Sequence, residues 1–157
     1  MQETPLGNLV VDDKIVQELM ATNKFEIMTQ EMDEDEHSIE MHLPYIAKVF
    51  QGKDITVVPI MVGSINYSSE IEYGKLLAPY LKDPENLFVI SSDFCHWGSR
   101  FRYQPYDSDS GLEIHSYIEQ LDLEGMNLIE RQDCKGFSDY LKKKKNTICG
   151  RHPIAVL

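Results

Sequence analysis

The distribution of apolar residues along the chain predicts three buried strands. Apolar, partly β-branched runs occupy residues 9–11, 55–62 and 87–90. Short runs of this kind are typical of strands that are buried on both faces, as in parallel sheets. The run 87–90 follows the turn signal Asp83-Pro84 and gives way at once to polar residues. Ligands bind just beyond the carboxyl ends of such strands, so we expect a site there.

Apolar positions three and four residues apart predict the helices. They indicate helices at residues 12–21, 37–50, 68–81, 111–121, 122–129 and 133–145. Pro44 should kink or break the second of these, because proline removes a backbone hydrogen bond. Residues 25–28 are expected to form a further short strand, and the acidic residues 31–36 a solvated loop. The predicted fold is therefore α/β, with a mixed, largely parallel sheet flanked by helices in a single domain, residues 1–157.

Composition narrows the classes of partner. The chain has 15 Lys and Arg against 26 Asp and Glu, a formal net charge of −11. That balance argues against nucleic acid and anionic membranes as partners, since both attract basic surfaces. No apolar run approaches the roughly 18 residues of a membrane span, so membrane insertion is not expected. The three scattered cysteines form no disulfide framework and favour a reducing, cytosolic setting.

Chemistry-bearing residues follow the run 87–90 directly. Asp93, Cys95 and His96 lie within four residues of one another, where they could move protons, bind a metal, or merely satisfy backbone groups of the loop. The loop 98–111 is long and interleaves aromatics with Arg100 and Arg102. It could bind an anionic or aromatic ligand, or it could be held in place by its own aromatic rings.

A second group of candidates lies in the helix predicted at residues 37–50. His37, Glu40 and His42 suggest a metal site, but His42 lies about 140° around the helix from His37. A two-histidine site on this helix is therefore disfavoured. We expect one polar group to point into a cleft, and His37 is the candidate ligand-binding residue.

Three longer motifs carry a family resemblance. They are DEDEHSIEMHLPY at residues 33–45, SSDFCHWG at 91–98 followed by RFRY at 100–103, and NTICGRHPI at 146–154. Together they closely resemble the Memo family, named for mediation of ErbB2-driven cell motility. The resemblance covers essentially all of the chain, which is similar to the middle half of a family member. The N-terminal third and the C-terminal end of the family pattern are missing.

The resemblance implies a fold similar to that of class III extradiol dioxygenases of the LigB type, here incomplete. In family members a cleft holds two histidines from the N-terminal third together with the residues that correspond to His96 and Cys149, with Asp93 beside them. The family is associated with iron or copper, with copper-linked redox chemistry, and with phosphotyrosine peptides of receptor kinases or adaptor proteins. A cytoplasmic location is implied, with the nucleus as a second compartment.

Carried over to this chain, the resemblance makes Cys149 the metal ligand and His96 the acid or base. Asp93, which lies beside them, could fix the tautomer of His96, as carboxylates do for histidine. Because the two family histidines are missing, only weak metal binding, or none, is expected from this chain alone. The leading hypothesis is a signalling protein in cell motility downstream of receptor tyrosine kinases, with a metal-capable cleft. The alternative is a metal-dependent redox enzyme, although a cysteine in place of a carboxylate disfavours dioxygenase activity.

The phosphopeptide interpretation depends on a separate set of residues. Phosphate would be neutralised by arginines and the tyrosine ring stacked on aromatics. The candidates are Arg100, Arg102 and Arg151 for the phosphate, and Trp97, Phe101 and Tyr103 for the ring.

Overall fold

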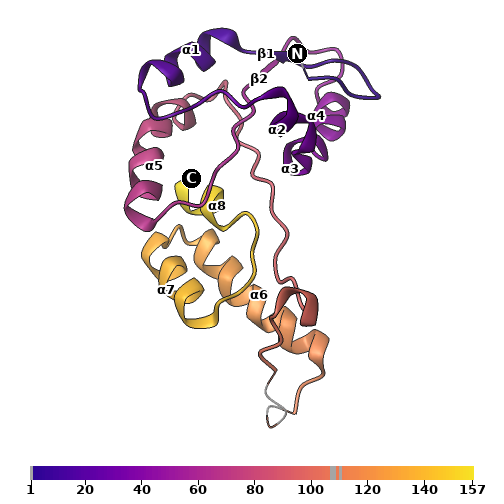
Figure 1. Ribbon diagram of the computed structural model, residues 1–157, viewed down its shortest axis with the longest axis vertical. Helices are drawn as coiled ribbons and strands as arrows, with labels where there is room; N and C mark the ends of the chain where they lie inside the picture. Colours follow the sequence, from indigo (N-terminus) through magenta and orange to yellow (C-terminus); the bar gives the residue numbers. More distant parts are fainter. Residues whose placement is uncertain (1, 107–108, 110) are drawn as a thin grey trace. The chain divides into compact units, whose positions relative to one another are not determined.

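A computed structural model describes residues 2–106, 109 and 111–157 and combines helices with a small parallel sheet (Figure 1). The strands are β1 (Val10–Val11) and β2 (Thr56–Val57). The α-helices, in chain order, are α1 (Asp13–Ala21), α2 (Gln30–Asp35), α3 (His37–Glu40), α4 (Leu43–Val49), α5 (Tyr67–Leu81), α6 (Ile114–Glu130), α7 (Cys134–Lys144) and α8 (Arg151–Val156). A short 3₁₀ helix, η1 (Ser99–Phe101), precedes α6.

The chain divides into two compact units. The first extends to Met61 and contains the sheet and α1 to α4, and the second comprises Val62–Leu157 with the remaining helices. The prediction of one domain for residues 1–157 stays a prediction.

The sheet of the first unit is parallel, as expected, but each strand has only two residues. The predicted strand 55–62 is therefore wrong beyond Val57. Asp12 ties the sheet to α1, because its carboxylate accepts hydrogen bonds from the Ile15 N–H at 3.0 Å and the Thr56 hydroxyl at 2.9 Å. These bonds, with Ile15 contributing most, lower the pKa of Asp12, as suits a carboxylate that caps a helix.

Two further predictions for the first unit are wrong. The acidic block 31–36 is not a loop, because most of it forms α2. Thr29 caps that helix, and Glu31 and Asp33 in its first turn suit the positive end of the helix dipole. Residues 25–28 form no strand. The expected break at Pro44 is confirmed, because α3 ends at Glu40 and Pro44 lies in the first turn of α4.

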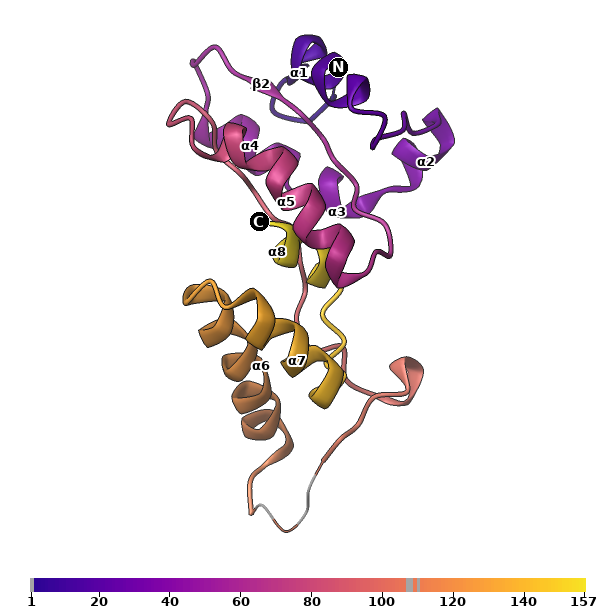
Figure 2. The same cartoon turned by 90° about the vertical axis from the view of Figure 1, so that its left-hand side faces the viewer.

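The second unit has a core of side chains from α6, α7 and the segments beside them. Helices α6 and α7 pack against each other, and α8 packs against α5 (Figures 1 and 2). Gly74 permits the second contact, since a Cβ at this position would lie 2.6 Å from the Val156 carbonyl oxygen. The buried core residues are Tyr103, Leu121, Phe137, Tyr140 and Ile148.

The predicted buried strand at 87–90 is absent. This segment is extended, but no strand of the described chain pairs with it, and Leu87 and Val89 are 71% and 50% exposed. A strand exists only where a neighbour supplies the ladder of hydrogen bonds, and an apolar run alone does not provide that neighbour.

Residues 111–129 also differ from expectation. The two helices predicted at 111–121 and 122–129 are one helix, α6. Asp122 lies inside that helix, and its carboxylate accepts hydrogen bonds from groups outside α6. Among the described residues, no helix is both long and apolar enough to cross a membrane.

Candidate functional site

Two extended segments of the second unit lie side by side and carry the candidate site (Figure 1). They comprise residues 92–96 and 147–150, and hydrogen bonds join them directly. The Cys149 N–H donates to the Asp93 carbonyl at 3.3 Å. The His96 N–H donates to the Thr147 hydroxyl at 2.7 Å, and that hydroxyl donates to the His96 carbonyl at 3.0 Å.

Ile148 anchors the second segment in the core. Its side chain is fully buried, in the cluster that includes Leu121, Phe137 and Tyr140. Burying an isoleucine contributes about 1.5–3 kcal/mol, as much as two or three ordinary hydrogen bonds. Cys149, the next residue, is exposed, so the core fixes the backbone while the thiol stays accessible.

Gly150 allows the two segments to approach. A Cβ at this position would lie 2.4 Å from the Ser92 Cβ and 2.5 Å from the Ser91 carbonyl oxygen, closer than real contacts permit. The Gly150 N–H instead donates to the Ser92 hydroxyl at 3.0 Å. Glycine is therefore required here for space rather than for an unusual φ.

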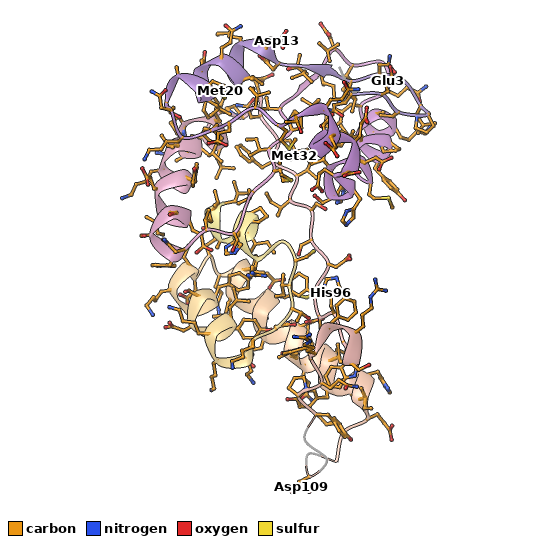
Figure 3. All side chains as sticks on the ribbon, viewed as in Figure 1. Glu3, Asp13, Met20, Met32, His96 and Asp109 are labelled. Atoms are coloured by element: carbon orange, nitrogen blue, oxygen red, sulfur yellow. The ribbon has the colours of Figure 1, made fainter. Side chains whose placement is uncertain are left out.

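The paired segments bring together a thiol, an imidazole and a carboxylate. One ligand atom each from Asp93, His96 and Cys149 lies within 4.8 Å of the other two. His96 is three-quarters buried on the extended segment that leads to η1 (Figure 3), whereas the Asp93 side chain is 86% exposed. We call these three residues the Asp93–His96–Cys149 cluster.

A backbone carbonyl fixes the tautomer of His96. The Thr147 carbonyl oxygen lies 2.6 Å from Nδ1, and because a carbonyl can only accept, Nδ1 carries the proton. In the neutral ring Nε2 is then an acceptor, and it faces Asp93 Oδ2 at 3.6 Å. Nε2 and Oδ2 are both acceptors, so a proton or a metal cation between them would make this short separation favourable. Thr147 thus orients the His96 ring through Nδ1, and the orienting role predicted for Asp93 stays a prediction.

The two cysteines of this region differ in environment. The Cys149 Sγ accepts a hydrogen bond from the Asp93 N–H at 3.1 Å and is exposed. Burial raises the pKa of the Cys95 thiol, and the charge of Asp122 raises it further. Cys95 therefore stays a thiol at neutral pH, and Cys149 is the sulfur of the cluster.

The cluster fits a soft or borderline metal ion. Two ligands of one such ion, each about 2.0–2.3 Å from it, can lie at most about 4.3 Å apart. The separations of up to 4.8 Å are only slightly larger, and the exposed Asp93 and Cys149 side chains have room to adjust. Thiolate and imidazole suit copper and iron, and thiolate favours copper(I).

The other predicted ligand-binding residues lie outside the cluster. Trp97 packs its ring edge-on against Tyr103 and Tyr117, with centroid distances of 6.4 and 6.2 Å. The Arg100 guanidinium lies over the Phe101 ring at 5.9 Å, and that ring lies 5.1 Å from the His96 ring.

Three more candidates remain predictions. Arg102 is exposed and follows η1 in the left-handed region, with φ 52°. Arg151 begins α8 and donates to the Ile148 carbonyl at 3.5 Å. His37 is the first residue of α3 in the first unit, whereas the cluster belongs to the second.

Sequence reasoning did not find three residues that shape the site. Thr147 contacts His96 through the bonds described above, and the Ser92 hydroxyl lies 3.9 Å from the Cys149 Sγ. Asp122 accepts a hydrogen bond from the Cys95 N–H at 3.3 Å. Thr147 and Ser92 lie inside the NTICGRHPI and SSDFCHWG motifs, so motif membership was the available signal. Asp122 had none, because its partners are distant in sequence.

Comparison with known proteins gives a consistent result. The model of the family described as "Memo-like protein" matches residues 1–157. The chain is 58% identical over 156 residues to Protein MEMO1 of Xenopus laevis, and 57% identical to Protein MEMO1 of Homo sapiens. In both cases the match covers 98% of this chain and 52% of the relative. Protein memo-1 homolog of Caenorhabditis elegans is 53% identical over 154 residues, 44% of its length. The chain thus spans about half the length of the curated relatives it matches.

The close approach at Gly150 gives a prediction. In Gly150→Ala the added Cβ should push the Ser91 and Ser92 backbone away and weaken the bond from the Cys149 N–H to Asp93. Amide hydrogen exchange of Cys149, measured by NMR, should become faster by about tenfold or more. Gly63→Ala is the control, since a Cβ there meets nothing within 4 Å. Unchanged exchange in Gly150→Ala would show that the two segments are not packed as described.

Proposed function

This chain belongs to the Memo-like protein family, and we propose that it serves in cell-motility signalling downstream of receptor tyrosine kinases, with a metal-capable cleft for copper or iron. The single observation that supports the metal site is the Asp93–His96–Cys149 cluster, in which three different donor types converge within 4.8 Å. A LigB-type dioxygenase-like fold, and a cytoplasmic location with the nucleus as a second compartment, belong to the same proposal.

Each residue of the cluster has a separate task in the proposal. Cys149 would hold the metal through Sγ, which the Asp93 N–H orients at 3.1 Å. His96 would offer Nε2, because the Thr147 carbonyl occupies Nδ1. Asp93 would hold a proton or contribute an oxygen ligand on the exposed side. The bound metal would supply a redox-active or Lewis-acid centre.

The same region supports a second candidate, the binding of a phosphotyrosine peptide. The specific observation is the stack in which the Arg100 guanidinium lies over Phe101 and Phe101 lies beside the His96 ring. A cation and an aromatic face side by side match the two halves of a phosphotyrosine side chain. Arg102, Arg151 and Trp97 are the further residues we assign to this role.

The metal proposal predicts a graded response to substitution. Cys149→Ser should weaken copper(I) binding about 100-fold, because it removes the thiolate ligand. His96→Gln should weaken it about tenfold, because it removes the imidazole Nε2. Cys134→Ser is the control, because Cys134 is an exposed thiol at the start of α7, outside the cluster. Competition with a colorimetric copper(I) chelator measures the affinities.

Two outcomes separate the hypotheses on metal chemistry. Equal copper affinity in Cys149→Ser and Cys134→Ser would contradict the assigned site. Metal-dependent oxygen consumption that requires Cys149 would favour the alternative of a metal-dependent redox enzyme over a signalling role.

If the chain binds phosphotyrosine peptides, its affinity for a tyrosine peptide should depend on the phosphate group and on Arg100. A tyrosine peptide should bind at least about tenfold more tightly when phosphorylated, because Arg–phosphate bonds are charge-assisted. Arg100→Gln should remove most of that difference, whereas Arg131→Gln, at the exposed end of α6, should not. Isothermal titration of both peptide forms measures this. Identical affinity of the two forms for the unaltered protein would refute peptide recognition.

A further inference from the structure

We infer that Asp122 is a positioning residue for the Asp93–His96–Cys149 cluster, because its carboxylate holds both of the segments that carry the cluster. The part of this inference that is tested by copper(I) affinity rests on the proposed function. Its structural part concerns how the two segments are kept together and stands without a metal.

One oxygen of the Asp122 carboxylate accepts a hydrogen bond from within residues 92–96, and the other accepts one from Asn146, which directly precedes residues 147–150. Oδ2 accepts from the Cys95 N–H at 3.3 Å, between Asp93 and His96 in sequence. Oδ1 accepts from the Asn146 Nδ2 at 2.8 Å, directly before Thr147. Asp122 lies within α6, which packs on α7, so both segments are fixed to a helix of the core.

Asn146 depends on this contact. Asn146 is only 4% exposed, and its side-chain oxygen Oδ1 is buried with no hydrogen-bond partner among the described atoms. The side chain is therefore held by its amino group alone, which donates to Asp122 and to the Tyr140 hydroxyl, both at 2.8 Å. If the Asp122 acceptor is lost, the buried Asn146 amide keeps only its hydrogen bond to the Tyr140 hydroxyl. A buried polar group without a hydrogen-bond partner lowers the stability of the fold.

The chemistry of the position calls for a carboxylate. Both partners are N–H donors, and an ionised carboxylate has two accepting oxygens and no hydrogen to present. An asparagine has one accepting oxygen and one amino group. In Asp122→Asn the side chain keeps its size, but either the Cys95 or the Asn146 N–H loses its acceptor, or the Asn146 amide turns over and gives up its bond to the Tyr140 hydroxyl. A hydrogen bond of the network is lost in each case.

Tyr140 provides a matched control within the same network. Its hydroxyl accepts from Asn146 and donates to the Leu121 carbonyl at 2.8 Å. Tyr140→Phe thus removes two hydrogen bonds near Asn146, as many as Asp122 makes, but leaves both bonds of Asp122. A purely structural role for the network predicts similar effects of the two substitutions on the cluster.

The test compares wild type, Asp122→Asn and Tyr140→Phe by two measurements. The first is amide hydrogen exchange of His96 and Cys149 in metal-free protein, each sample held at the same interval below its own melting temperature. The second is copper(I) affinity by chelator competition. Asp122→Asn should accelerate both amides and weaken copper binding, each about tenfold or more, while Tyr140→Phe should change either by less than about threefold.

The outcomes distinguish the inference from the proposed function. Equal effects of Asp122→Asn and Tyr140→Phe would overturn the positioning role. If wild type binds no copper, the proposed metal site fails, and the exchange data still decide the role of Asp122. If Asp122→Asn does not fold, Asn146→Ser replaces it: faster Cys149 exchange than in Tyr140→Phe supports the inference, and equal exchange overturns it.

Discussion

The candidate site depends on one interaction, the pairing of His96 with Thr147. Three hydrogen bonds join these residues, two through the Thr147 hydroxyl and one from the imidazole Nδ1 to the Thr147 carbonyl. The two bonds of the Thr147 hydroxyl, to the His96 N–H and carbonyl, set the spacing of the two segments. The imidazole bond leaves Nε2 as the atom that faces Asp93. Together with the bond from the Cys149 N–H to the Asp93 carbonyl, this pairing brings the three candidate metal-binding side chains close to one another.

The pairing is stable because the core and a glycine impose it. Ile148 is fully buried and lies between Thr147 and Cys149, so the packing of α6 and α7 determines where both neighbours lie. Gly150 then lets the Ser91 and Ser92 backbone approach closer than any side chain would allow. Burial therefore supplies the stability and hydrogen bonds supply the orientation, a division that is common where a rigid scaffold carries a reactive loop.

Several helix boundaries could be predicted from local sequence signals. Helices were expected to begin at Asp12 and at Asp133, and each of these side chains accepts a hydrogen bond from the first turn of its helix. The break at Pro44 was expected because proline acts on its own turn. The prediction of a strand at 87–90 was wrong because a strand needs a neighbouring strand to pair with, and hydrophobicity alone does not show whether that neighbour is present.

The candidate site, too, could be predicted only where its residues lie close together in sequence. Asp93 and His96 could be proposed from their spacing, and Cys149 only from the family motif, because 53 residues separate it from His96. Thr147 and Asp122 were missed for a physical reason: their roles consist of contacts with residues far away in sequence. Such contacts arise from the packing of α6, α7 and the two segments, which no periodicity in the sequence encodes.

The central claim is that the Thr147 carbonyl holds His96 with Nδ1 protonated and Nε2 directed at the cluster. Long-range ¹H–¹⁵N correlation NMR of the histidine rings tests it most directly, because the two neutral tautomers give different nitrogen shifts and coupling patterns. The account predicts, above the titration range of the ring, that His96 is in the Nδ1–H form while exposed histidines such as His37 show the usual tautomer mixture. A His96 ring with its proton on Nε2, or with averaged signals like those of His37, would contradict it.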